Sequence, residues 1–206
     1  PFDPLSYEQP CFIEGNAWQY MWFVPQDPQG LISLMGGREA FLKKLDENFT
    51  LTATSGERNG NASGFIGQYA HGNEPSHHTV YLYTMAGKPS RTEELVEQVR
   101  TSFYNATPCG YAGNDDCGQM SAWYIFSSLG FYPFNAGSAE YVIGTPLFTE
   151  ATLHLAGGHD FTIKARGKRD GQPHVKSVRL NGKRLRGHTL THQQIMAGDT
   201  LEFTMR

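Results

Sequence analysis

The sequence predicts an α+β protein in which helices come first and strands follow. Apolar residues recur at helical spacing in three segments before about residue 130, whereas short alternating or β-branched runs dominate after about residue 140. In that second part, the dipeptide Asn181-Gly182 separates two such runs, which is a strong signal for a hairpin with a type I′ turn. A chain of 206 residues with 39% hydrophobic residues is long and apolar enough for one large domain or two small ones.

The first part contains three segments in which apolar residues lie three or four positions apart. They are residues 37–49, 89–107 and 119–129. Ser90 and Glu93 form a capping-box pattern at the start of the second segment, which Pro108 closes. The third segment ends at Gly130, a residue type typical of helix C-termini. We therefore predict a helix in each segment.

The second part contains short runs with the pattern of strands. They are residues 141–143, 152–155, 161–163, 175–180 and 201–205. This change places a predicted domain boundary near residues 133–140, so that residues 1–135 form a helical domain and residues 136–206 a β-rich one.

The net charge of −3 hides an asymmetry between the two parts of the chain. Residues 160–206 carry ten Lys and Arg against four Asp and Glu, whereas residues 1–159 carry seven against sixteen. The basic residues are scattered among polar ones without stacking aromatics, which indicates a solvated face and argues against nucleic-acid binding. No apolar run approaches the roughly 18 residues of a membrane span. The chain opens at Pro1 without a signal segment, so we expect a fragment or a processed product.

Three loops repeat one design, in which an acid is flanked by glycine, amides and aromatics. Residues 113–118 contain the adjacent pair Asp115 and Asp116, residues 13–20 contain Glu14, and residues 71–78 contain Glu74. Three such loops predict one polar pocket.

Two of these acids suit complementary chemical roles. Asp116 with Gln119 three residues later fits an N-cap and its capping-box partner, which explains one carboxylate but not the pair. The N-terminus of a helix stabilises an anion and would keep Asp116 ionised as a base. Glu14 is either an ordinary exposed acid or, among its aromatic neighbours, a carboxyl with a raised pKa that suits a general acid. One protonated and one ionised carboxyl are the requirement for glycoside hydrolysis.

The loop of residues 71–78 also suggests a metal ion. Its histidine spacing is loose, and the three cysteines of the chain show no CxxC pattern, so zinc is disfavoured. Amide and carboxylate oxygens nearby are hard donors that calcium prefers. The alternative, left open, is that His77 and His78 cap or line a helix through residues 81–83. The tryptophans Trp18, Trp22 and Trp123 either stack on sugars or, more commonly, pack in a core.

Taken together, these motifs resemble those of the glycoside hydrolase family 92 α-mannosidases. The similar stretches are, in order, EGNAWQY at residues 14–20, GNEPSHH at residues 72–78 and GNDDCGQMSAWY at residues 113–124, followed by GFYP at residues 130–133. The resemblance covers essentially the whole chain and is most specific in residues 11–146. It implies the last helices of an (α/α)6 barrel followed by a small antiparallel β-sandwich tail, in a fragment of a larger enzyme.

The resemblance also implies a reaction, which is exo-acting, calcium-dependent hydrolysis of terminal α-mannosides with inversion. Glu14 matches the general acid of the family, Asp116 the general base, and Asp115 an assisting or alternative base. The implied substrate contacts are Asn16, Trp18, Asn73, Glu74 and Asn114, and the implied calcium ligands are Gln19, His77 and Asp116. Inversion requires the two catalytic carboxyls to lie roughly 6.5–9.5 Å apart.

Partners and location follow from the same resemblance. The implied partners are a mannose-containing oligosaccharide and the remainder of the catalytic region, including an N-terminal β-sandwich domain, without which we expect little or no activity. The implied location is the periplasm, the cell surface or the outside of the cell. Asn73-Glu74-Pro75 and Asn114-Asp115-Asp116 differ from the His-Glu-Pro and Gly-Asp-Glu-Asp of members that cleave α-1,2 linkages, so the linkage stays open. A carbohydrate-binding module without catalysis, or a structural piece of a larger assembly, are the alternative functions.

Overall fold

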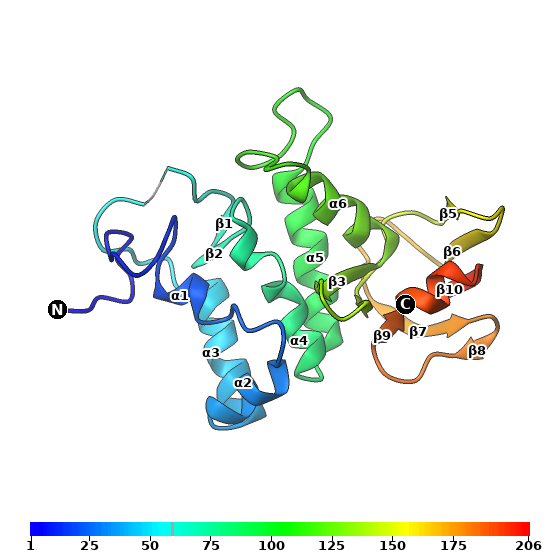
Figure 1. Cartoon of the computed structure of the whole chain (residues 1–206), viewed down its shortest axis with the longest axis horizontal. Coiled ribbons are helices and arrows are strands. Elements are labelled where there is room, and N and C mark those ends of the chain that lie inside the picture. The colour runs from blue at the N-terminus through cyan, green and yellow to red at the C-terminus, as the bar shows by residue number, and fades with distance from the viewer. Residues whose placement is uncertain (59) are drawn as a thin grey trace.

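The computed structural model describes residues 1–58 and 60–206, with α1 to α6 and the short β1–β2 hairpin on one side and strands β5 to β10 on the other (Figure 1). The α-helices are α1 (Ala17–Tyr20), α2 (Pro28–Leu34), α3 (Arg38–Thr50), α4 (Leu82–Met85), α5 (Pro89–Phe103), α6 (Gln119–Leu129) and α7 (His192–Met196). Two 3₁₀ turns, η1 (Glu74–Ser76) and η2 (Thr79–Tyr81), precede α4. In the part of the chain that the structure describes, no helix has the length and apolar character needed to cross a membrane.

The strands form three sheets. They are β1 (Phe65–Ile66), β2 (Tyr69–Ala70), β3 (Phe131–Asn135), β4 (Glu140–Ile143), β5 (Glu150–His154), β6 (Asp160–Arg166), β7 (Val175–Leu180), β8 (Lys183–Arg184), β9 (Thr189–Thr191) and β10 (Asp199–Met205). A hairpin pairs β1 with β2, a second sheet has the order β3-β4-β9, and a third has the order β5-β6-β10-β7-β8. The family resemblance implied an antiparallel tail, and this is wrong at one pair, because β10 inserts between β6 and β7 and runs parallel to β6.

Elements with strong local signals are confirmed. Helices α3, α5 and α6 coincide closely with the predicted segments, and Gly130 ends α6 with a left-handed φ of 94°. Asn181 and Gly182 both have positive φ, 51° and 75°, as a type I′ turn between β7 and β8 requires. The predicted capping box of α5 is wrong, because the helix begins at Pro89, so that Ser90 lies inside its first turn.

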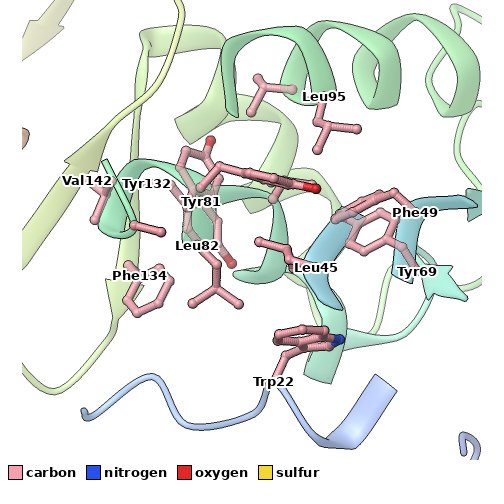
Figure 2. Packing of buried hydrophobic residues seen from close by; sticks show 14 of the residues in the cluster. Trp22, Leu45, Phe49, Tyr69, Tyr81, Leu82, Leu95, Tyr132, Phe134 and Val142 are labelled. Atoms are coloured by element: carbon pink, nitrogen blue, oxygen red, sulfur yellow. The ribbon is translucent and has the colours of Figure 1, made fainter. Parts of the chain in front are cut away.

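Strand β3, which the sequence analysis did not predict, separates two hydrophobic cores. Tyr132 and Phe134 join the cluster built from Trp22 and the helices, shown in Figure 2. Phe131 points to the opposite face and joins the core between the sheets and α6. Alternate residues of a strand face opposite sides, so the aromatic residues of one strand can pack into two cores. The predicted boundary at residues 133–140 therefore falls within the β3–β4 hairpin, and the division into two domains stays a prediction.

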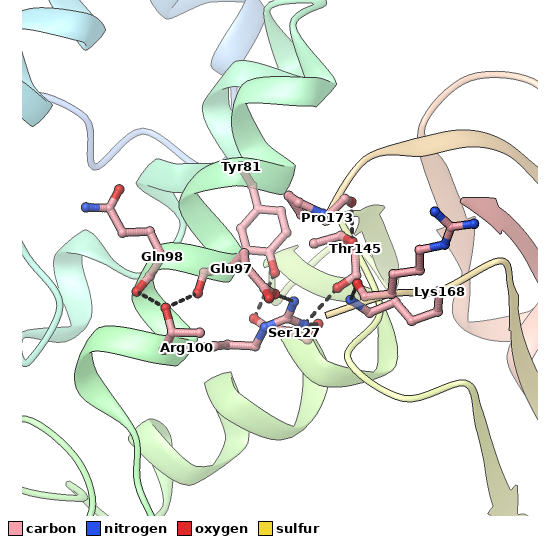
Figure 3. Close-up of polar contacts among 10 residues, drawn as sticks. Tyr81, Glu97, Gln98, Arg100, Ser127, Thr145, Lys168 and Pro173 are labelled. Atoms are coloured by element: carbon pink, nitrogen blue, oxygen red, sulfur yellow. Dashed lines mark hydrogen bonds and ion pairs between the residues drawn. The ribbon is translucent and has the colours of Figure 1, made fainter. Parts of the chain in front are cut away.

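A buried arginine ties the helices to the segment that follows β4. Arg100 of α5 is 3% exposed and donates hydrogen bonds of 2.9 Å to the carbonyl oxygens of both Ser127 and Thr145 (Figure 3). Its guanidinium also pairs with Glu97 at 2.5 Å. A buried charge is tolerated when it is paired and hydrogen-bonded, and here the partners of the two terminal nitrogens come from α5, α6 and the loop after β4, whereas Nε has none among the described residues. Arg100 thus fixes α6, and with it the loop that precedes α6.

We expect Arg100→Met to lower the free energy of unfolding by about 3–5 kcal/mol, since it leaves the Glu97 carboxylate unpaired and removes the guanidinium donor from two buried carbonyl oxygens. The matched control is Arg166→Met, because the Arg166 side chain is 71% exposed where it pairs with Glu202, and exposed pairs contribute about 0–1 kcal/mol. Urea unfolding of both variants measures the difference. An equal loss in the two variants would contradict the role of Arg100.

Candidate functional site

The structure brings the three acidic loops together. The carboxyl of Glu74 lies against that of Asp116, and the charge of Glu14 also acts on it. Glu74 and Asp116 line a hollow of about 500 Å³, together with His77 and Gln119. The wall opposite the polar residues comes from Phe23, Pro25 and the β3 region, residues 132–137. The predicted polar pocket is therefore present in part: the loops of residues 71–78 and 113–118 line it, whereas Glu14 is not among the described residues that line it.

Glu14 is held from both ends by asparagine side chains. Its Oε1 accepts a 2.6 Å hydrogen bond from Asn61 Nδ2, and its backbone carbonyl accepts a 2.9 Å hydrogen bond from Asn73 Nδ2. The residue has φ of 55°, a conformation that non-glycine residues rarely adopt. The predicted enclosure of this carboxyl by aromatics is wrong, because the side chain is half-exposed and bound by an amide. Asn73 positions Glu14 in this structure rather than standing free for a sugar.

The two adjacent aspartates have different roles. Asp115 Oδ1 accepts hydrogen bonds from the backbone N (3.0 Å) and the Oγ (2.8 Å) of Ser121, so Asp115 satisfies the first turn of α6. The predicted N-cap role of Asp116 is wrong, because the N-cap is Gly118. Asp116, Cys117 and Gly118 have φ of 45°, 59° and 95°, and these successive left-handed residues turn Asp116 away from the helix axis and toward the hollow. Asn114 is exposed beside them.

The polar residues of α1 form an internal network. Asn16 is fully buried and caps α1, and its Oδ1 accepts from the backbone N of Trp18 (3.0 Å) and Gln19 (3.3 Å). Gln19 Oε1 accepts from the backbone N of Asn16, and its Nε2 donates to Tyr7 Oη at 2.7 Å and to the Gln68 carbonyl at 3.0 Å. These contacts have a structural role, and the implied substrate contact of Asn16 and calcium contact of Gln19 stay predictions. The spacing of Asn16 and Gln19 is a capping box, a signal that the sequence contained.

Trp18 and His77 are both buried close to these loops. The Trp18 ring, 9% exposed, lies under the Lys44 amine, which is 3.6 Å from the ring centroid, so that face is occupied by a cation and not open to a sugar. His77 Nε2 lies 2.8 Å from the His71 carbonyl oxygen and donates to it, which leaves Nδ1 as the acceptor facing Gln119 Nε2 at 3.3 Å. Burial lowers the pKa of His77 to about 4, so its imidazole is neutral at physiological pH.

Two residues of the site were missed by the sequence analysis. Gln119 appeared only as a capping partner, although its place on the first turn after an acidic loop is a usable signal. Asn61 contacts Glu14 across 47 residues of sequence, and no local pattern indicates such a contact. Both are amides that orient a neighbouring side chain, Asn61 that of Glu14 and Gln119 that of His77.

The hollow has the kind of donor atoms that calcium prefers, but too few of them. Calcium takes six to eight oxygens, and the carboxylates of Asp116 and Glu74 with the amide of Gln119 are the oxygen donors that line the hollow deeply. Within residues 1–58 and 60–206, no group of three or more His, Cys, Asp or Glu side chains has an arrangement that could hold a metal ion. These residues alone do not complete a calcium site.

Comparison with known proteins identifies the family. The glycosyl hydrolase family 92 catalytic domain model matches residues 1–206. The chain belongs to this family. The family resemblance carried by the three acidic motifs is therefore confirmed, and the chain is part of a glycoside hydrolase catalytic domain.

Solved and curated relatives of this family 92 chain are considerably longer. A family GH92 α-mannosidase from Bacteroides thetaiotaomicron, in complex with mannoimidazole, is 39% identical with a TM-score of 0.93 and matches 100% of this chain and 28% of its own. A family GH92 inverting mannosidase from the same organism is also 39% identical, with a TM-score of 0.85, and matches 100% of this chain and 29% of its own. An uncharacterized secreted glycosidase from Arthroderma benhamiae is 29% identical over 202 residues, which are 93% of this chain and 23% of that protein.

The contact between Glu74 and Asp116 has a consequence for stability. Burial raises the pKa of Glu74 from its ordinary value of 4.5, and the neighbouring charges of Asp116 and Glu14 raise it further. An acid whose pKa is higher in the folded state costs stability once it ionises. That cost is absent below pH 4.5, and it appears as the pH rises through the raised pKa.

We therefore expect Glu74→Gln to raise the unfolding temperature at pH 7 and to leave it nearly unchanged at pH 4. The measurement is thermal unfolding in EDTA at both pH values. Glu150→Gln is the control, since the Glu150 side chain is 61% exposed and has only a 3.9 Å contact with Lys164. The same shift for Glu74→Gln at both pH values would contradict the carboxyl–carboxyl contact.

Proposed function

We propose that the protein containing this chain is an exo-acting, calcium-dependent α-mannosidase that hydrolyses terminal α-mannosides of glycans with inversion. The observation that carries the proposal is the convergence of Glu14, Glu74 and Asp116 in a family 92 chain. Support comes from the relative solved with mannoimidazole, which shares 39% identity and a TM-score of 0.93, and from the relative described as an inverting mannosidase.

Asp116 is the proposed general base. Its carboxylate lines the hollow and is not used to cap α6, because Asp115 provides that contact. In a single displacement, Asp116 accepts a proton from a water molecule while the water oxygen bonds to the anomeric carbon. The attack comes from the face opposite the leaving group, so the configuration at that carbon inverts.

Glu14 is the proposed general acid. It donates its proton to the glycosidic oxygen as the bond to the anomeric carbon breaks, and the aglycone leaves as a neutral alcohol. The hydrogen bonds from Asn61 and Asn73 hold its carboxyl and its backbone in one orientation. Glu14 and Asp116 belong to different loops. This suits a mechanism in which the acid and the base act on opposite faces of the sugar.

Glu74 connects the two groups. A carboxyl with a raised pKa that contacts Asp116 can donate a hydrogen bond to it and stabilise its ionised form. The same side chain lines the hollow, which suits a contact with a sugar hydroxyl. Calcium would provide a positive charge that polarises sugar hydroxyls. The residues that would contribute to holding it are Asp116, Glu74 and Gln119, completed by donors from outside this chain, from substrate or from water.

The proposal includes the remainder of the protein. The chain spans 23% to 29% of the length of the relatives described above. We propose that an N-terminal β-sandwich and the other helices of an (α/α)6 barrel complete the site, and that this chain alone hydrolyses poorly or not at all. A location in the periplasm, on the cell surface or outside the cell is consistent with the relative named as a secreted glycosidase.

We expect the longest protein containing this chain to release mannose from α-mannobiose or aryl α-mannosides, and EDTA to abolish the release. Glu14→Gln and Asp116→Asn should each lower kcat about 10²–10⁴-fold, because each removes one proton transfer. Asp115→Asn tests the alternative base and should lower kcat less. Asp170→Asn, an exposed aspartate on the β-rich side, is the matched control and should leave kcat unchanged.

The outcomes separate the candidate functions. Sugar binding that survives both substitutions, without mannose release by any form, would favour a carbohydrate-binding module. Absence of both binding and turnover would favour a structural role. Equal turnover by this chain and the longer protein would contradict the proposed need for the remaining domains.

A further inference from the structure

One short segment touches all three acidic loops although it contributes no acid itself. This segment is residues 61–64, which we call the junction segment. Its first residue, Asn61, donates to Glu14 Oε1 at 2.6 Å. Its last two residues pair with the second loop, since Gly72 N donates to the Ser63 carbonyl and His71 N to the Gly64 carbonyl, both at 3.0 Å.

The third loop packs on the same segment without space to spare. A Cβ atom on Gly64 would lie 3.0 Å from the Cβ of Ala112, and one on Gly113 would lie 2.7 Å from Ser63 Oγ. The junction segment is therefore enclosed between residues 71–72 and residues 112–113. Glu74 follows the first pair by two residues, and Asp116 follows the second by three, so the spacing across the junction sets how closely their carboxyls approach.

Ser63 occupies the centre of this junction. A Cβ atom on Gly72 would lie 2.0 Å from Ser63 Oγ and 2.8 Å from the Ala112 carbonyl oxygen, distances that real Cβ contacts essentially never show. Among the described residues, the buried Ser63 Oγ has no hydrogen-bond partner. A buried hydroxyl without a partner is unfavourable, so hydrogen bonding does not explain a serine here. Its volume does, because it fills the gap between two glycine backbones.

We propose that Ser63 is a positioning residue, which spaces the Gly72 and Gly113 backbones so that Glu74 and Asp116 meet while Asn61 orients Glu14. This inference rests on the proposed function, because it concerns the alignment of the same carboxyls. Ser63 itself touches neither substrate nor the reacting atoms. A misplacement of about 1 Å at a catalytic group can cost about 10²-fold in rate, so a methyl group at this junction is enough to matter.

The test uses kcat and KM for an aryl α-mannoside, with the longest protein containing this chain. Gly72→Ala should lower kcat about 100-fold with a smaller change in KM, because the added methyl group separates the loops. Ser63→Gly in the Gly72→Ala background removes the nearest atom that the methyl group meets, leaves only the 2.8 Å approach to the Ala112 carbonyl oxygen, and should raise kcat about tenfold above that of Gly72→Ala. Gly60→Ala is the matched control, since a Cβ there would meet nothing within 4 Å.

Thermal unfolding of each variant separates positioning from general damage. A fall in kcat for Gly72→Ala without a comparable loss of folded protein, together with rescue by Ser63→Gly, would support the inference. A loss of activity that only follows the loss of folded protein, or a double variant no better than Gly72→Ala, would overturn it. If the wild-type protein releases no mannose, the proposed function is overturned. If the wild-type protein is active and Gly72→Ala leaves kcat unchanged, only this inference is overturned.

Discussion

The geometry of the site depends on the hydrogen bond between Trp123 Nε1 and the His77 carbonyl oxygen, 3.1 Å long. Trp123 is fully buried in the middle of α6, and its ring stacks on Tyr104 at 6.0 Å and meets His71 edge-on at 4.4 Å. A buried indole whose N–H is hydrogen-bonded packs against its neighbours and also fixes the orientation of the group that it binds. The bond ties the loop that carries Glu74 to the helix that follows Asp116. Of the two interpretations of this tryptophan, stacking on sugar or packing in the core, the structure supports the core.

The structural elements that depend on local interactions were predicted correctly from the sequence. Helix α6 has apolar residues at helical spacing and a glycine C-cap, and the β7–β8 turn has Asn181-Gly182, so both were confirmed. The parallel pairing of β6 with β10 depends on a partner many residues away and could not be predicted. The error in the predicted N-cap had a similar cause. The sequence pointed to Asp116 as the cap, whereas the left-handed backbone of residues 116–118 makes Gly118 the N-cap and leaves the first-turn contact to Asp115.

The proposed acid and base both have a strained backbone. Glu14 and Asp116 are among the described non-glycine residues with positive φ, and such a conformation costs on the order of 1–3 kcal/mol. Each is held by contacts on both sides, Glu14 by Asn61 and Asn73, and Asp116 by the cap that Asp115 makes to α6. Because those contacts hold the backbone, the strained conformation persists. At Asp116 it presents the carboxyl toward the hollow, and at Glu14 it presents a carboxyl whose charge acts on Glu74.

The remaining question is what balances the negative charge of Glu74 and Asp116. Glu74 and Asp116 line the hollow without a Lys or Arg among the described residues around it, and His77 and His78 are neutral because burial lowers the pKa of each. Like charges this close raise each other's cost of ionisation, so either a proton or a cation is favoured between them. In the free chain, burial and the neighbouring charges raise the pKa of Glu74, so its ionisation carries a cost. A divalent cation would allow both carboxylates to ionise at once, which is a physical reason to propose calcium that does not depend on the family resemblance.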